Sequence, residues 1–203
     1  MTRESRWDEL VAVAAEVFGE KGYRATTLSE IADRLGILKG SLYHYIETKE
    51  DLLFEVLKRW ALKGIEVATE SDESRAADAP TRLAAFIDTW MSQPPSAARR
   101  GHLSEADVKY LTGTRLAEVD ALHRQLGRIP LGIIKDGMSE GSFDPGVNPL
   151  LATDSLFQLL LGTDRRYAGR QPAKRSEISS WYVQLMLGGL TLSRRSGPAA
   201  NGL

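Results

Sequence analysis

The chain has 203 residues, with 42% hydrophobic and 26% charged residues, which is typical of a soluble globular protein that can bury a substantial core. It contains no cysteine, and this excludes disulfides, a thiolate nucleophile and a cysteine metal site. No apolar run reaches the roughly 18 residues of a membrane span and no secretory leader is evident, so we expect a cytoplasmic protein without a membrane partner. The formal net charge of −1 provides no bulk attraction for nucleic acid.

Two helices are predicted at the start of the chain. Apolar residues recur at helical spacing over about 6–20 and again over 28–35. Thr27 and Glu30, three residues apart at the start of the second segment, match a capping box. Both segments are therefore expected to be amphipathic helices that pack on one another.

A sharp turn and a third helix follow. Gly36 is suited to the turn because glycine adopts positive φ at little cost. A helix over about 38–46 would direct an apolar stripe inward, formed by Leu38, Leu42, Tyr45 and Ile46. The order helix, glycine turn, helix is typical of a helix-turn-helix.

The outward face of this third helix has the composition of a DNA-reading surface, because it is small at its start, rich in donors and without an acid. Lys39 and Ser41 are expected to reach base edges, and the other polar members to hold phosphates. The alternative is an ordinary solvated helix surface. The predicted DNA-binding set is Thr26, Thr27, Lys39, Gly40, Ser41, Tyr43, His44 and Lys49.

The segment GILKGSLYHYIETKEDLL, residues 36–53, resembles the signature of the TetR family of transcriptional regulators, and residues from about 6 to 57 fit that family in register. Leu38 departs from it, since many members carry a polar capping residue there. The resemblance implies a homodimeric repressor that binds a palindromic operator on double-stranded DNA and is released by a small-molecule effector.

The remainder of the chain predicts a larger helical body, so that the fold class is all-α with about nine helices. Further helices are expected to begin near residues 48, 80, 104, 115, 149 and 177, and Pro130 should bend or split the fourth of these. The predicted domains are a helix-turn-helix head over 1–49, a ligand-binding and dimerisation body over 50–195, and a disordered tail over 196–203.

A ligand pocket is predicted inside the body, with core packing as the alternative for each residue. Residues 158–172, QLLLGTDRRYAGRQP, are similar to a TetR-family branch that responds to acyl-CoA or steroid-derived CoA thioesters, which implies that arginines here meet ligand phosphates. The alternatives for these arginines are a solvated basic loop or salt bridges within a dimer. The predicted set is Phe86, Trp90, Leu111, Leu122, His123, Leu126, Ile133, Phe157, Gln158, Arg165 and Arg166.

The last two predicted helices are apolar over more than one face, and a monomer would leave a large patch in water. Glycines inside them cost about 1 kcal/mol each relative to alanine, which close helix–helix approach would justify. The predicted dimer interface is Leu156, Leu160, Gly162, Trp181, Leu185, Gly188 and Gly189.

Catalytic and metal-binding signals are weak. His102 and His123 stand 21 residues apart, and no nucleophile elbow, P-loop or dinucleotide fingerprint occurs. We therefore expect no enzyme, no catalytic residue, no metal and no cofactor. The alternative to a DNA-binding regulator is a small-molecule-binding helical protein whose head mediates protein–protein contacts.

Overall fold

The computed structural model describes residues 3–71, 77–93, 105–166 and 172–191. Within these ranges it has eight α-helices, one 3-10 helix and no strand, so the all-α prediction is confirmed. None of the described helices is long and apolar enough to cross a membrane. The elements are α1 (Arg3–Lys21), α2 (Leu28–Leu35), α3 (Lys39–Leu42), α4 (Lys49–Ser71), α5 (Ala79–Ser92), η1 (Glu105–Tyr110), α7 (Gly113–Glu140), α8 (Pro149–Arg166) and α9 (Pro172–Thr191).

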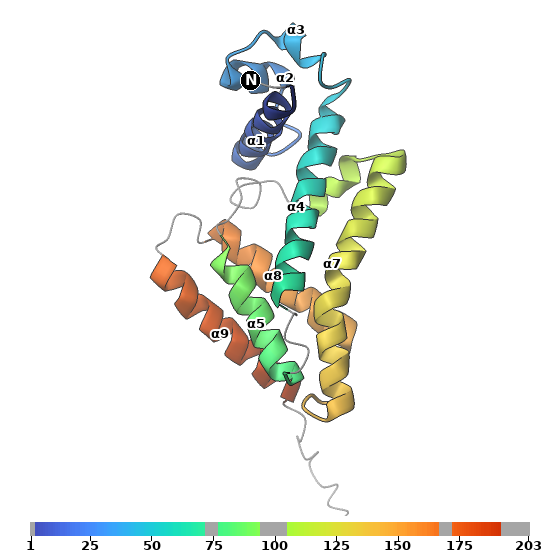
Figure 1. Ribbon diagram of the computed structural model, residues 1–203, viewed down its shortest axis with the longest axis vertical. Helices are drawn as coiled ribbons and strands as arrows, with labels where there is room; N and C mark the ends of the chain where they lie inside the picture. Colours follow the sequence, from blue (N-terminus) through green and yellow to red (C-terminus); the bar gives the residue numbers. More distant parts are fainter. Residues whose placement is uncertain (1–2, 72–76, 94–104, 167–171, 192–203) are drawn as a thin grey trace, which may run out of the picture.

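The first three helices form a head at one end of the molecule, and α4 runs from it into the body (Figure 1). Apolar side chains of α1, α2 and α3 meet the first half of α4 in one core. Phe18, Ile31, Leu42 and Leu52 are fully buried there. The apolar spacing read from the sequence therefore does define the inward face of these helices.

The third helix is shorter than the predicted 38–46 and covers only Lys39–Leu42. Beyond Leu42 the chain continues in tight turns, in which the N–H of His44 donates to the carbonyl of Ser41. Leu38 precedes the helix as its N-cap, with extended backbone angles of φ −69° and ψ 140°. A residue in that conformation does not share the helical face of Leu42, so the inward placement predicted for Leu38 is wrong.

The body is built on α4 and α7, which lie side by side, with α5, α8 and α9 packed around their far ends (Figure 1). Helix α7 is a single helix from Gly113 to Glu140 with Pro130 buried inside it, so the proline does not split it. A second core gathers Leu83, Ile133, Leu156 and residues of α4 and α9.

Two predicted element starts are also corrected. The segment near residues 104–111 forms a 3-10 helix, η1, and not an α-helix. Helix α9 begins at Pro172 and not near residue 177. By contrast, α8 begins at the predicted residue, Pro149, where the side chain of Asn148 accepts hydrogen bonds from the N–H groups of Leu150 and Leu151 and caps the helix. The predicted tail, residues 196–203, lies outside the described residues.

The head is tied to the start of α7 by apolar and polar contacts. Leu111 and Val119 are buried in the first core. The N–H of Thr112 donates to Oε1 of Glu50 at 2.8 Å, and Arg115 forms an ion pair with Asp51. Since this core takes residues from beyond position 49, the head does not close on its first three helices alone. The domain boundaries stay a prediction.

Gly137 offers a test of the packing between α7 and its neighbours. A Cβ there would lie 2.3 Å from Cδ2 of the buried Phe143 ring and 2.9 Å from Cβ of Ala79. We expect Gly137→Ala to lower the free energy of unfolding by about 2 kcal/mol, because neither neighbour can move without disturbing the core. The matched control is Gly132→Ala on the same helix, where a Cβ would meet nothing within 4 Å. This substitution should raise the free energy of unfolding by about 0.5–1 kcal/mol, because alanine favours a helix more than glycine does. Urea denaturation measures both changes. Equal effects at the two positions would contradict this packing.

Candidate nucleic-acid interface

Helix α2, which precedes the turn to α3, is capped at both of its ends. At the start of α2, the Thr27 side chain accepts from the N–H of Glu30, and the Glu30 carboxylate accepts from the N–H of Thr27 at 2.9 Å, which completes the predicted capping box. At its end, Gly36 adopts φ 70° and its N–H reaches the carbonyls of Ala32 and Asp33. A Cβ at Gly36 would meet nothing within 4 Å, so backbone conformation and not space requires glycine.

Most of the predicted DNA-binding residues lie on the surface of the head. Lys39, Gly40, Tyr43 and His44 are exposed, as is Thr27, and Ser41 is half-buried. Lys39 makes no ion pair with any residue that the structure describes. The short α3 therefore presents a cation, an open glycine backbone and a tyrosine that is 53% exposed.

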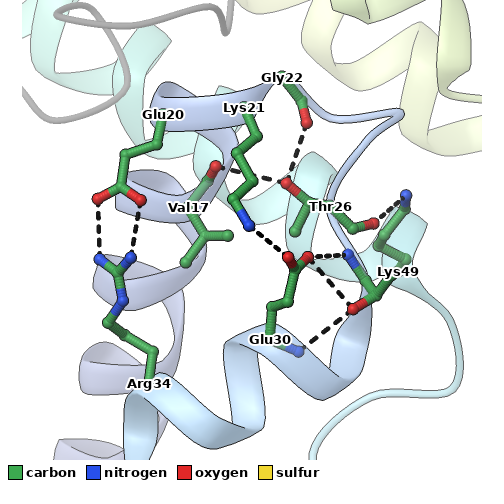
Figure 2. Close-up of polar contacts among 9 residues, drawn as sticks. Val17, Glu20, Lys21, Gly22, Thr26, Glu30, Arg34 and Lys49 are labelled. Atoms are coloured by element: carbon green, nitrogen blue, oxygen red, sulfur yellow. Dashed lines mark hydrogen bonds and ion pairs between the residues drawn. The ribbon is translucent and has the colours of Figure 1, made fainter.

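Thr26 is the first correction to this set. Its side chain is 2% exposed, and its hydroxyl lies 3.0 Å from the carbonyl oxygen of Gly22 and 3.4 Å from that of Val17 (Figure 2). A hydroxyl that donates within the α1–α2 connection cannot also reach a phosphate. Thr26 holds that connection against the end of α1.

Lys49 is the second correction. Its ammonium donates to the carbonyl oxygens of Tyr23 and Thr26, both at 2.8 Å, and lies 4.3 Å from the centroid of the Tyr23 ring. Burial lowers the pKa of the Lys49 ammonium, partly opposed by the nearby charge of Glu30. The first residue of α4 is thus bound to the α1–α2 connection (Figure 2), and two of the three donors of its ammonium are used there.

Acidic side chains of the head hold two of its other cations, Arg34 and Lys21 (Figure 2). Arg34 makes two hydrogen bonds to the Glu20 carboxylate, at 2.8 and 2.7 Å, and Lys21 pairs with Glu30. The hydrogen bonds from Lys21 and from the N–H of Thr27 lower the pKa of the Glu30 carboxyl to about 2. These pairs fasten α2 to α1, which explains how a nearly neutral head can still present the cation of Lys39.

Two exposed residues of the head are absent from the predicted DNA-binding set. Leu38 is 80% exposed beside Lys39, and its position was misassigned because the helix begins one residue later than predicted. Arg24 is exposed in the connection before α2. The lack of a polar capping residue at position 38 was the signal that could have identified Leu38.

The predicted pocket residues divide between two places. Phe86, Trp90 and Phe157 form an aromatic cluster with centroid separations of 5.8–6.2 Å, and Leu126 and Trp90 both approach Gly64 of α4. Leu111 instead belongs to the head core, and this separates it from the others.

The other pocket candidates are dispersed. Leu122 and His123 are half-buried on α7, with His123 edge-on to the Trp60 ring at 5.4 Å, and Gln158 is exposed. Arg165 and Arg166 end α8, but their side chains lie outside the described residues. Among the described residues, no group of three or more His, Asp or Glu residues could hold a metal ion.

The dimer candidates also divide. Leu156 and Leu160 are fully buried in the second core of the single chain, so their assignment to a dimer surface is wrong. Trp181 and Leu185 on α9 are 59% and 44% exposed. A Cβ at Gly162, Gly188 or Gly189 would meet nothing within 4 Å, and each of these glycines therefore has open space beside it.

These features define the class of the protein: an all-helical protein with an amino-terminal helix-turn-helix joined by one long helix to a larger body. The model of the family "Bacterial regulatory proteins, tetR family" matches residues 10–56, which span the head and the start of α4. The head thus has the sequence and the fold of the TetR family of transcriptional regulators, which is not a family of enzymes.

The similarity to individual relatives extends over nearly the whole chain. The HTH-type transcriptional repressor KstR2 of Rhodococcus jostii is 28% identical over 193 residues, covering 93% of this chain and 92% of that protein. The ketosteroid transcriptional regulator KstR2 of Mycobacterium tuberculosis superposes with a TM-score of 0.75 at 25% identity, covering 94% and 97%. AibR, solved with isovaleryl coenzyme A and operator DNA, superposes with a TM-score of 0.70 at 23% identity, covering 89% and 97%.

The two lysines of the head should behave differently when neutralised. Lys49→Met removes two hydrogen bonds from a charged donor and should lower the free energy of unfolding by about 1–2 kcal/mol. Lys39→Met, at an exposed position, should change it by less than about 0.5 kcal/mol. Urea denaturation of both variants provides the measurement. A stable Lys49→Met variant would mean that the ammonium does not hold the α1–α2 connection.

Proposed function

We propose that this protein is a ligand-responsive transcriptional repressor that binds a palindromic operator as a homodimer. The observation that carries the proposal is the exposed surface of α3 and of the turn after it, with Lys39, Gly40, Tyr43 and His44, in a helix-turn-helix whose first helix is capped at both ends. Repressor relatives such as KstR2 support it. In this reading the surface enters the major groove, and the protein acts in the cytoplasm, where the DNA is.

We assign the roles on this surface as follows. Lys39 and Ser41 reach base edges, and Tyr43, His44 and the exposed Thr27 hold phosphates. Gly40 lets the backbone approach closely, since nothing occupies the space beside it. Lys49 and Thr26 support the surface from behind by holding the α1–α2 connection.

For the dimer, we assign the partner surface to the exposed sides of α8 and α9. Trp181 and Leu185 of α9 leave large apolar side chains in water, as do Leu150 and Leu151 of α8. A second copy that covered them would remove an apolar surface of a kind that soluble monomers rarely expose. The open space beside Gly188 and Gly189 permits close approach of a partner helix.

For the effector, we propose an acyl-CoA or a related CoA thioester. The support is the capture of isovaleryl coenzyme A by AibR and the two arginines that end α8, Arg165 and Arg166. The aromatic cluster of Phe86, Trp90 and Phe157 would line the acyl site. A ligand that shifts α7 would disturb the head through Thr112 and Arg115, and a coupling of about 1–3 kcal/mol is enough.

The operator test is selection of genomic fragments by the purified full chain, followed by fluorescence anisotropy on the enriched sequence over a salt series. One enriched palindrome is expected, released by acyl-CoA but not by free CoA. Lys39→Met should relax the sequence preference at one position of each half-site, and Lys49→Met should leave the slope of log Kd against log salt unchanged. Absence of binding at low salt, with and without acyl-CoA, would contradict the proposal and favour a head that contacts proteins.

The dimer test is Trp181→Asp, which places a charge in the proposed apolar interface. We expect the variant to sediment as a monomer at micromolar concentration and to bind a single half-site only weakly, because the two heads are no longer joined. Leu62→Asp, on the exposed side of α4, is the matched control and should remain dimeric. Analytical ultracentrifugation measures both. A dimeric Trp181→Asp variant would place the interface elsewhere.

A further inference from the structure

Leu38 is the most exposed large hydrophobic residue of the described chain, at 80%. It lies between Ile37, which packs against the head core, and Lys39, the first residue of α3. Its side chain takes no part in either core. An isolated exposed leucine is common on protein surfaces, so its position must carry the argument.

At this position α3 lacks a side-chain cap. Leu38 is the N-cap residue of α3 and makes no side-chain hydrogen bond there. Serine, threonine, aspartate or asparagine would accept a backbone N–H at an N-cap, whereas leucine leaves that donor to solvent. The stability of α3 therefore does not account for leucine at this position, and neither does packing of the head.

The surroundings of Leu38 match the edge of a base pair. Lys39 beside it is exposed and makes no described ion pair, Gly40 has open space beside it, and Tyr43 is exposed. No acidic residue occurs in residues 37–46, which favours a polyanion as the partner. In the major groove, the one apolar group on a base edge is the C5-methyl of thymine.

We propose that Leu38 is a specificity-determining residue that contacts the C5-methyl group of a thymine in each half-site of the operator. This inference rests on the proposed function and deepens it, since it assigns one base type to one side chain. Lys39 is placed to contact the neighbouring base edge, and Gly40 allows the backbone to approach.

The test replaces each thymine of the selected operator in turn with deoxyuridine, which lacks only the methyl group. For the wild-type chain, we expect Kd to rise about fourfold when deoxyuridine replaces thymine at one position per half-site. This is the change expected from removing one buried methyl contact. Leu38→Ala should bind the thymine operator more weakly and should bind the thymine and deoxyuridine operators equally. Comparing the two proteins on the two operators measures the coupling between Leu38 and the methyl group. A purely structural role of Leu38 would produce no such coupling.

Two further variants separate recognition from folding. Leu38→Ser restores a capping side chain, so its Tm should rise while its discrimination between thymine and deoxyuridine is lost. Leu62→Ala removes another exposed leucine, on α4, and should retain the discrimination of the wild type. If Leu38→Ser binds the thymine operator as tightly as the wild type or more tightly, Leu38 is only a poor cap and the inference is overturned.

The remaining outcomes are also decisive. Discrimination that persists in Leu38→Ala, or wild-type binding that is insensitive to deoxyuridine at every position, overturns the inference while the proposed function stands. A wild-type chain that selects no operator at low salt overturns the proposed function, and the inference with it.

Discussion

Helix α4 is shared by two hydrophobic cores, and the rest of the structure depends on that sharing. Its first half buries Leu52 and Leu53 in the head core, and its second half buries Val67 and Ala68 in the body core. Helix α7 repeats the arrangement, with Val119 in the first core and Ile133 in the second. Because packed cores resist small displacements, two parallel helices that each enter both cores form a stiff connection between head and body.

Polar contacts make the head end of this connection specific. Glu50 and Asp51 in the first turn of α4 bind Thr112 and Arg115 at the start of α7. Lys49, one residue earlier, binds two carbonyls of the α1–α2 connection. A single turn of α4 therefore contacts both the support of the helix-turn-helix and the start of α7, so a movement of α7 would reach the head at this turn.

The distribution of charge in the head follows from the same contacts. Lys21 and Arg34 are engaged by Glu30 and Glu20, and Lys49 is engaged by backbone carbonyls. These cations stabilise the arrangement of α1, α2 and α4, while Lys39 is left on the surface. Bulk charge is thus a poor guide to this head, because Lys21 and Arg34 are paired with acids on its surface while Lys39 makes no ion pair with any described residue.

The sequence by itself determined the helical class, the turn at Gly36 and the capping box of Thr27 and Glu30, because helical periodicity and caps depend on residues a few positions apart. It did not determine where α3 ends or that Leu38 is exposed. When the helix starts one residue later than predicted, Leu38 lies before the helix and no longer shares a face with Leu42. Only the tertiary structure decided that Lys49 and Thr26 turn inward and that Leu156 and Leu160 fill the core of one chain. Those outcomes depend on partners distant in sequence, such as the carbonyl of Tyr23 for Lys49, and local sequence patterns do not predict such contacts.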